Sequence, residues 1–334
     1  MDTYNMNHQK INSSLSVDMV KPILAVSGAI NWDIGLYVSK FAEPGEEVEA
    51  KRIERIPGGK GANVAVAAAR ILGKGQSAII GGIGNDEIGN RHISIFEDEG
   101  VNTKWLLKFD DMESGQAYIV IDEKGENQIN TYFGANWALN KKHAEYVKDI
   151  FNSLRCLVLI DPPIEFSEEL LSEAKGTIKI WLPGVKILSN RDSILAKLND
   201  ISYLVVNEHE LKNLFGSNNM EETYKIIKDR NINLKIIVTR GSSGVTLITR
   251  TSSYSVKGID LNELGLKVVN TVGCGDAFLG AFASYLILGY EEEKALTMAN
   301  LAGALKATRY ETRGSPTNAE LESYFQKLYW TNIS

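Results

Sequence analysis

The chain has 334 residues, of which 44% are hydrophobic and 23% charged, a composition typical of a globular protein with room for one large α/β domain and an appendage. Its 42 acidic and 36 basic residues give a net charge of −6, and no stretch clusters lysine and arginine, so we expect no nucleic-acid partner. The two cysteines, Cys156 and Cys274, are too few for a disulfide framework and too far apart in sequence for a zinc site.

The first 21 residues are polar, and we expect them to form a mobile extension before a folded domain at 22–334. They lack the apolar segment of a signal peptide. No uninterrupted run of about 18 apolar residues occurs in the chain, so nothing predicts a membrane span. We therefore expect a cytoplasmic protein with no membrane partner.

The first buried strand is predicted at 23–30, where the apolar run Ile-Leu-Ala-Val-Ser-Gly-Ala-Ile precedes Asn31, Trp32 and Asp33. Ligands of open α/β sheets bind at the carboxyl ends of the strands, so Asn31 and Asp33 are candidate site residues. The alternative is a polar strand end with an Asx turn, which would use the same residues.

Two separated segments read as a small β-sheet. Residues 34–57 scatter apolar positions among Glu, Lys and Pro, as short and partly exposed strands do. Residues 116–122 and 127–133 are β-rich arms around a Gly-containing turn, the pattern of a hairpin. Because the two segments are far apart in sequence, a unit built from both would be inserted in the main domain.

A glycine loop opens the first predicted helix. Residues 58–63 read Gly-Gly-Lys-Gly-Ala-Asn and continue into an alanine-rich segment. The loop is not a Walker A motif. That motif needs a glycine five positions before the Gly-Lys pair and a Ser or Thr directly after it, and the sequence around Gly59, Lys60 and Gly61 has neither.

From residue 138 onward, strands and helices alternate regularly. Such alternation indicates a parallel sheet covered on both faces, so the predicted fold class is α/β, doubly wound and mainly parallel. The predicted strands are 156–161, 178–182, 203–207 and 236–239, and the predicted helices lie near 140–154, 166–175, 189–199 and 221–230.

A second glycine loop runs into a long apolar helix at 269–286. Gly273 and Gly275 allow the backbone to bend around Cys274, and the N–H groups and the helix dipole together favour a bound anion. Asp276 would repel that anion unless it has a task such as taking a proton from an attacking hydroxyl. The alternative is a glycine-rich turn with an aspartate that only favours the helix start.

Together the two glycine loops resemble those of the PfkB family of small-molecule kinases, also called the ribokinase family, over nearly everything from residue 23 onward. The resemblance implies an ATP-dependent, Mg²⁺-requiring transfer of phosphate to a primary hydroxyl of a pentose, with ribose as the first choice. A nucleoside kinase of the same fold and a non-catalytic sugar or nucleotide sensor are the alternatives. An ADP-release assay would separate them.

The resemblance also implies roles for individual residues. Asp276 would be the base, beside the anion loop of Gly273, Cys274 and Gly275. The sugar hydroxyls would be held by Asn31, Asp33, Gly59, Lys60, Asn63 and Asp161. Asp161 stands where the ribose-specific members carry a glutamate, which leaves the sugar open.

On the nucleotide side, Asn207 and Glu210 match an Asn-x-x-Glu element that positions Mg²⁺ and its waters. They equally fit a helix start with a capping Asn and a first-turn Glu. The resemblance places Thr239, Gly241 and Gly244 at the nucleotide phosphates and Asn300 at the adenine pocket, although a lone Asn on an Ala-rich helix is more often a packing residue.

Two further expectations concern the β unit and a monovalent cation. The resemblance implies that 34–57 and 112–134 form a lid, and its exposed strands invite a homodimer. Members of the family commonly hold K⁺ beside the anion loop, with an aspartate at the position of Asn270 and carbonyls from that loop and from the segment near 307–315. Because an amide lacks the carboxylate charge, we expect weak or absent K⁺ activation.

Overall fold

The structure is a computed structural model that describes Val17, residues 20–184, 187–216, Thr223, Lys225, Ile227 and 233–330. The predicted N-terminal extension and the helix predicted at 221–230 fall largely outside this part of the chain. Val17 is buried, and its carbonyl accepts a hydrogen bond from the Asn102 side chain at 3.2 Å. None of the described helices is both long and apolar enough to cross a membrane.

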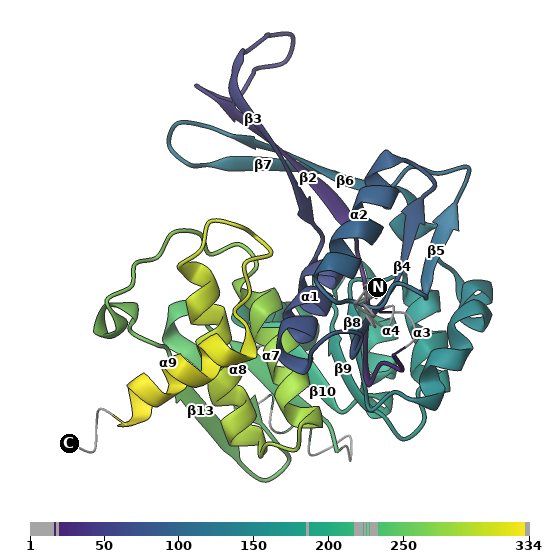
Figure 1. The fold of residues 1–334 in the computed structure, drawn as a ribbon, viewed down its shortest axis with the longest axis vertical. Coiled ribbons are helices and arrows are strands. Elements are labelled where there is room, and N and C mark those ends of the chain that lie inside the picture. The colour runs from purple at the N-terminus through teal and green to yellow at the C-terminus, as the bar shows by residue number, and fades with distance from the viewer. Residues whose placement is uncertain are drawn as a thin grey trace, which may run out of the picture.

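A large twisted sheet forms the centre of the molecule (Figure 1). The strands pair in parallel except β12 and β13, which return antiparallel at one edge. This arrangement confirms the predicted α/β fold with a mainly parallel sheet. Within the described residues the order is β13 (Ser253–Lys257), β12 (Gly244–Ile248), β11 (Lys235–Thr239), β10 (Tyr203–Asn207), β9 (Ile178–Leu182), β8 (Cys156–Ile160), β1 (Leu24–Gly28), β4 (Ser77–Gly84) and β5 (Leu106–Phe109).

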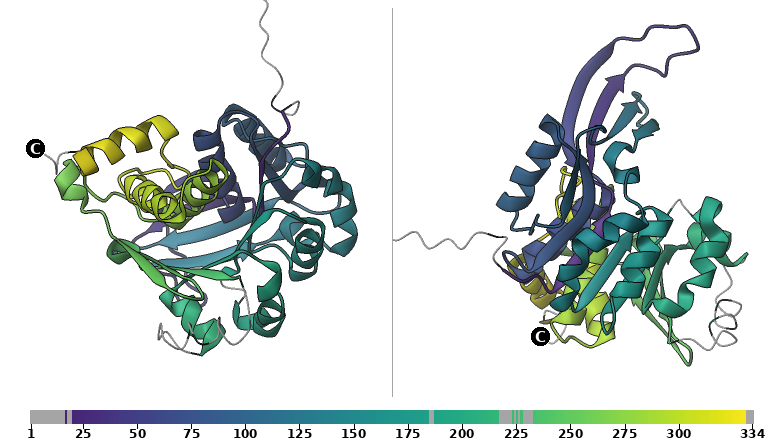
Figure 2. Two further views of the ribbon diagram at one scale, coloured as in Figure 1. Left: turned by 90° about the horizontal axis from the view of Figure 1, so that it is seen from below. Right: turned by 90° about the vertical axis from the view of Figure 1, so that its right-hand side faces the viewer.

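Helices cover both faces of this sheet (Figure 2). Alternate residues of a strand point to opposite faces, so Val26 and Val158 enter one core while Ala25 and Leu157 enter the other. The first core is built with α1 (Lys60–Leu72), α2 (Glu87–Asp98), α7 (Cys274–Ile287), α8 (Glu292–Ala307) and α9 (Asn318–Trp330); the second with η3 (Lys141–Asn152), α3 (Ile164–Glu173), α4 (Ile187–Ala196), η5 (Leu198–Asp200) and α5 (Glu208–Phe215).

A second sheet projects from the main body at the top of Figure 1. Its order among the described residues is β3 (Ala50–Gly58), β2 (Asn31–Val38), β6 (Gly115–Ile121) and β7 (Asn127–Tyr132), with β2 and β6 parallel and the other pairs antiparallel. We call it the small sheet. It joins two segments that are far apart in the sequence, and η2 (Gly134–Trp137) follows it.

The first predicted strand is shorter than expected. β1 ends at Gly28, where a side chain would collide with the Ile160 carbonyl, and β2 begins after only two intervening residues. Asn31 and Asp33 therefore lie within β2, paired with the neighbouring strands, and not in a turn after β1. The alternative of a polar strand end with an Asx turn is therefore wrong.

Candidate active site

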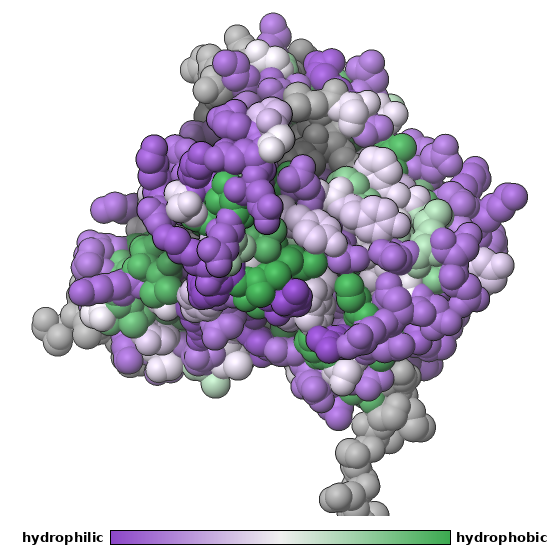
Figure 3. Space-filling view, turned by 90° about the horizontal axis from the view of Figure 1, so that it is seen from above, coloured by the Kyte–Doolittle hydropathy of each residue, from purple (hydrophilic) through white to green (hydrophobic). Residues whose placement is uncertain are grey.

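The carboxyl ends of the parallel strands and the N-termini of α1 and α7 meet at one edge of the large sheet. Gly28 lies opposite Ile160 in the register of β1 and β8, and Asn207 lies opposite Thr239 in that of β10 and β11. Open α/β sheets bind ligands at this edge. Seen from the side of the small sheet, the surface shows apolar residues gathered in the centre within a polar surround (Figure 3).

The second glycine loop adopts the geometry of an anion site. Gly273 has φ 86° and caps α7, and a side chain there would collide with the Thr312 carbonyl. The first N–H groups of a helix have no acceptor inside it, and a Cβ on Gly275 would meet no atom within 4 Å. The loop therefore presents free donors and the positive helix end to open space.

Asp276 follows in the first turn of α7, where a chain of side chains holds it. The Asn63 amide donates to Asp276 Oδ2 at 2.8 Å, and Asn63 Oδ1 accepts from Arg313 Nε at 3.2 Å. Arg313 also donates to the Gly58 carbonyl at 2.9 Å. The two glycine loops, which are more than 200 residues apart, are thus joined through Asn63.

Burial shapes the charges in this chain of contacts. It raises the pKa of Asp276, although the Asn63 hydrogen bond and the Lys60 and Arg313 charges act against it. It lowers the pKa of Arg313 to about 10, while the guanidinium lies 5.4 Å from the Phe96 ring centroid. A carboxylate with a raised pKa is a stronger base than a solvated one, which suits proton abstraction.

Lys60 and Asp161 form an ion pair beside these loops. Lys60 Nζ lies 2.9 Å from Asp161 Oδ2. Burial opposes the charged form of Lys60, but Asp161 raises the lysine pKa overall. Asp161 itself has φ 50°, and its Oδ1 is buried with no partner among the described residues. Strain and an unmet acceptor at one residue mark a place where a ligand hydroxyl can donate.

Asp33 and Asn31 come from the base of the small sheet. The Asp33 carboxylate lies against Gly58, where any side chain would collide with it. Burial is the main reason that the pKa of Asp33 is raised to about 6. The Asp276 charge also raises it, and the Arg313 charge acts in the opposite direction. Asn31 is held differently, since its Oδ1 accepts from Asn136 at 2.9 Å.

Asn207 and Glu210 form a reciprocal cap at the start of α5. Asn207 Oδ1 accepts from the Glu210 N–H at 2.8 Å, and Glu210 Oε2 accepts from the Asn207 N–H at 2.9 Å. Glu210 still has a second carboxylate oxygen, and burial raises its pKa. Among the described residues no group of three or more His, Cys, Asp or Glu gathers as metal ligands. One carboxylate suits Mg²⁺, which keeps several waters and binds substrate phosphates, better than it suits a caged metal.

The remaining nucleotide-side candidates lie along β11, β12 and α8. Thr239 ends β11, and Gly241 begins the single turn η6 (Gly241–Ser243). Gly244 has φ 101°, and a side chain there would collide with the Val256 carbonyl. Asn300 donates to the Lys257 carbonyl at 2.9 Å, which ties α8 to β13.

Two residues that the sequence analysis did not single out take part in the site. Arg313 supports Asn63, and Lys306 is fully buried beside the segment that leads into the anion loop. Lys306 had a signal, because it interrupts an apolar stretch of α8. Arg313 had none, since it lies in an irregular segment whose position depends on the whole fold.

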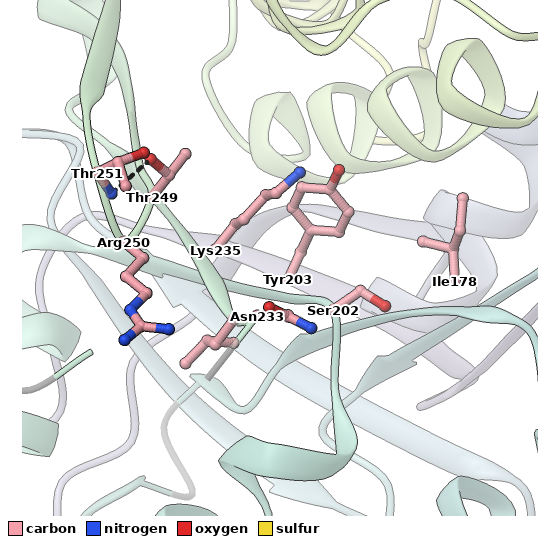
Figure 4. A pocket seen from close by; sticks show the side chains of 9 residues that line it. Ile178, Ser202, Tyr203, Asn233, Lys235, Thr249, Arg250 and Thr251 are labelled. Carbon is pink, nitrogen blue, oxygen red and sulfur yellow. Dashed lines mark hydrogen bonds between the residues drawn. The ribbon is translucent and has the colours of Figure 1, made fainter. Parts of the chain in front are cut away.

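A separate hollow of about 440 Å³ lies at the opposite end of the sheet (Figure 4). Tyr203 and Lys235 both bind Glu292 there, so their polar groups are satisfied. The hollow contains none of the predicted site residues. It is lined by Ile178, Ser202, Tyr203, Asn233, Leu234, Lys235, Thr249, Arg250 and Thr251.

A doubly wound sheet with a carboxylate beside an anion loop at its strand ends defines the class of small-molecule phosphotransferases. Residues 22–319 match the pfkB family carbohydrate kinase, and the chain belongs to this family of enzymes, which phosphorylate a sugar hydroxyl.

Three comparisons illustrate the relationship. A ribokinase from Dictyostelium discoideum is 31% identical over 87% of this chain and 96% of its own. A deoxyribokinase from Salmonella typhi is 30% identical over 89% and 96%. The crystal structure of a ribokinase from Thermotoga maritima is 28% identical and superimposes with a TM-score of 0.81, covering 91% of this chain and 99% of the other.

Proposed function

We propose that this chain is an ATP- and Mg²⁺-dependent kinase that transfers the γ-phosphoryl group to a primary hydroxyl of ribose. The proposal rests on the position of the Asp276 carboxylate. Asn63 holds it in the first turn of α7, whose N-terminus carries the anion loop. The relatives named ribokinase support the choice of sugar, and a solved ribokinase from Arabidopsis thaliana is described in complex with ribose and ATP.

Asp276 takes the proton of the sugar hydroxyl, and the oxygen attacks the γ-phosphorus. The bond from that phosphorus to the oxygen bridging to the β-phosphate breaks, and ADP leaves with the electron pair. The N–H groups of Gly275 and Asp276 and the positive end of α7 stabilise the equatorial oxygens, so catalysis is mainly positioning and electrostatics. Glu210 and Asn207 would hold Mg²⁺ through its waters, which neutralises phosphate charge.

The sugar side offers hydroxyl acceptors in fixed positions. Asp33 is wedged against Gly58, and the free Oδ1 of Asp161 is buried. Lys60, which pairs with Asp161, adds a donor. Cis-diol and ring hydroxyls satisfy such groups, whereas a sugar that lacks one hydroxyl would leave a buried acceptor unpaired at a cost of about 1–3 kcal/mol.

An ADP-release assay across ribose, 2-deoxyribose and a set of nucleosides tests this proposal. We expect the highest kcat/KM for ribose. A preference for deoxyribose would change the sugar and leave the chemistry, and turnover with nucleosides alone would favour the nucleoside kinase. Binding of sugar and ATP without ADP release would indicate a sensor and refute the proposed reaction.

We also propose that residues 22–334 act as one kinase domain with a lid from 34–57 and 112–134, and that the lid pairs two copies. Side chains alternate between the faces of the small sheet, and the face opposite to Asp33 carries a group of apolar side chains, of which Ile53 is 44% and Tyr118 40% exposed. A homodimer would bury this face. Leu36→Glu places a charge on it, so the molar mass measured by light scattering should fall to that of a monomer. This face includes Ile34, Leu36, Ile53, Tyr118 and Val120.

A further inference from the structure

Lys306 carries a charge into the interior. It lies in the last turn of α8 between Leu305 and Ala307, and 0% of its surface is exposed. Burial lowers the pKa of Lys306, and the nearby Glu311 and Asp276 act in the opposite direction. A buried ammonium is costly unless oxygen acceptors replace its water, so its acceptors indicate its role.

Those acceptors are backbone carbonyls from two separate segments. Lys306 Nζ donates to the Asn270 carbonyl at 2.9 Å, and it lies 3.4 Å from the Arg309 carbonyl. Asn270 precedes the anion loop by three residues, and Arg309 lies in the turn after α8. The ammonium therefore joins the turn to the segment that supports the anion loop.

The Asn270 side chain completes this connection. Its Nδ2 donates to the Tyr310 carbonyl at 2.8 Å, and its Oδ1 accepts from the Val272 N–H at 2.9 Å. The Asn270 N–H donates to the Ala307 carbonyl at 3.1 Å. An aspartate at this position could not donate to Tyr310, so an amide fits the contacts that are present.

A potassium ion does not fit this arrangement. The carbonyl oxygens of Asn270, Ala307, Arg309 and Tyr310 all lie within reach of donors that belong to the chain. An added cation at the Asn270 carbonyl would also meet the Lys306 ammonium that already donates to it, and two like charges close together in the interior repel each other. The residues present therefore disagree with the K⁺ site that the family resemblance implies.

We propose that Lys306 is a positioning residue whose ammonium replaces the monovalent cation and, with Asn270 as its matching partner, holds the anion loop in shape. A carboxylate with K⁺ sums to zero charge, whereas an amide with an ammonium sums to +1. The loop is thus supported by a fixed positive charge, which favours a bound triphosphate. The kinetic tests below rest on the proposed kinase function, and the thermal test does not.

The first test compares turnover of the wild-type enzyme in KCl with turnover in tetramethylammonium chloride at equal ionic strength. We expect a change of less than about twofold, since the charge is already present. A saturable rise of about tenfold or more at low millimolar K⁺, worth roughly 1.4 kcal/mol of barrier, would overturn the proposal.

The second test removes the charge with Lys306→Met, which keeps an unbranched side chain and loses the terminal ammonium. We expect kcat to fall by about tenfold to a hundredfold while KM for the sugar stays near the wild-type value, because the anion loop and not the sugar site loses support. Lys294→Met on the exposed part of the same helix is the matched control and should retain kcat. A folded Lys306→Met enzyme with wild-type kcat would contradict the assignment.

The third test needs no catalysis and covers the case in which Lys306→Met folds poorly. The double variant Lys306→Ala with Asn270→Asp removes the internal ammonium and leaves a space beside a new carboxylate, where K⁺ can bind. A ligand that binds only the folded state stabilises it, so KCl should raise the melting temperature of the double variant, relative to tetramethylammonium chloride, and leave that of the wild type unchanged. The same K⁺ response in both proteins, or in neither, would refute the proposal.

Discussion

The two ends of the large sheet carry similar polar residues in opposite states. At the carboxyl end, Asp161 has a buried oxygen without a partner and φ 50°, and burial raises the pKa of Asp33 to about 6. At the other end, Tyr203 and Lys235 both bind Glu292 beside a hollow of about 440 Å³. Unmet hydrogen bonding and strain therefore indicate the reactive end, and the size of a hollow does not.

The largest effect should follow from Asp276→Asn at the carboxyl end. We expect kcat to fall by about 10²–10⁴-fold with little change in ATP affinity, because the substitution removes the base and leaves the anion loop intact. Single-turnover kinetics together with nucleotide titration measure both quantities. Near-normal turnover would show that Asp276 only favours the start of α7.

Arg313→Lys should have the next largest effect. A lysine keeps the charge but is shorter and lacks the planar fork by which two guanidinium nitrogens bond Asn63 and Gly58, so Asn63, the partner of Asp276, loses support. We expect kcat to fall by about tenfold to a hundredfold with a smaller change in KM. Arg91→Lys, on the exposed part of α2, serves as the control and should behave as the wild type.

Asp33→Asn should separate stability from function. The folded-state pKa of Asp33 lies above the ordinary value of 3.8, so its contribution to stability is present below pH 3.8 and is lost as the pH rises through about 6. At pH 7.5 the ionised group thus destabilises the fold, and we expect the variant to gain up to about 3 kcal/mol in the free energy of unfolding. Urea denaturation measures the gain, and KM for the sugar should rise. An unchanged unfolding midpoint at pH 7.5 would contradict this interpretation.

The smallest effect should come from the satisfied end of the sheet. Lys235→Met breaks the ion pair with Glu292, which is partly exposed, so we expect a stability loss of no more than about 1 kcal/mol. The kcat and both KM values should match the wild type. A clear fall in turnover would show that the hollow takes part in the reaction and would remove the contrast between the two ends.

The buried strands were the part of the fold most open to prediction from the sequence. The strands predicted at 178–182 and 203–207 have the same bounds in the structure, because strands covered on both faces read as continuous apolar runs. The segment predicted as a helix near 140–154 is a 3₁₀ helix at Lys141–Asn152, a distinction that apolar spacing alone does not make.

Within the site, the glycine loops were visible in the sequence because their chemistry is local, whereas the groups that hold them were not. Arg313 reaches Asn63 across 250 positions of sequence, and no local pattern encodes that contact. The unpaired oxygen and the strained backbone of Asp161 likewise arise only when β8 is set beside its neighbours. These features depend on tertiary structure.

Strand β2 of the small sheet connects the sugar side of the site to the segment that precedes the anion loop. That strand carries Asp33 near its base and Tyr37 further out, and Tyr37 donates to Glu54 at 2.7 Å. Glu54 also accepts from Tyr310 at 2.5 Å, and the carbonyl of Tyr310 is bonded to Asn270 below the anion loop. A tilt of the small sheet would therefore move Asp33 together with the contacts that lead to the anion loop. If the two sites are coupled in this way, thermodynamic linkage requires that sugar and nucleotide change each other's affinity by the same factor, which titrations in the two orders of addition would measure.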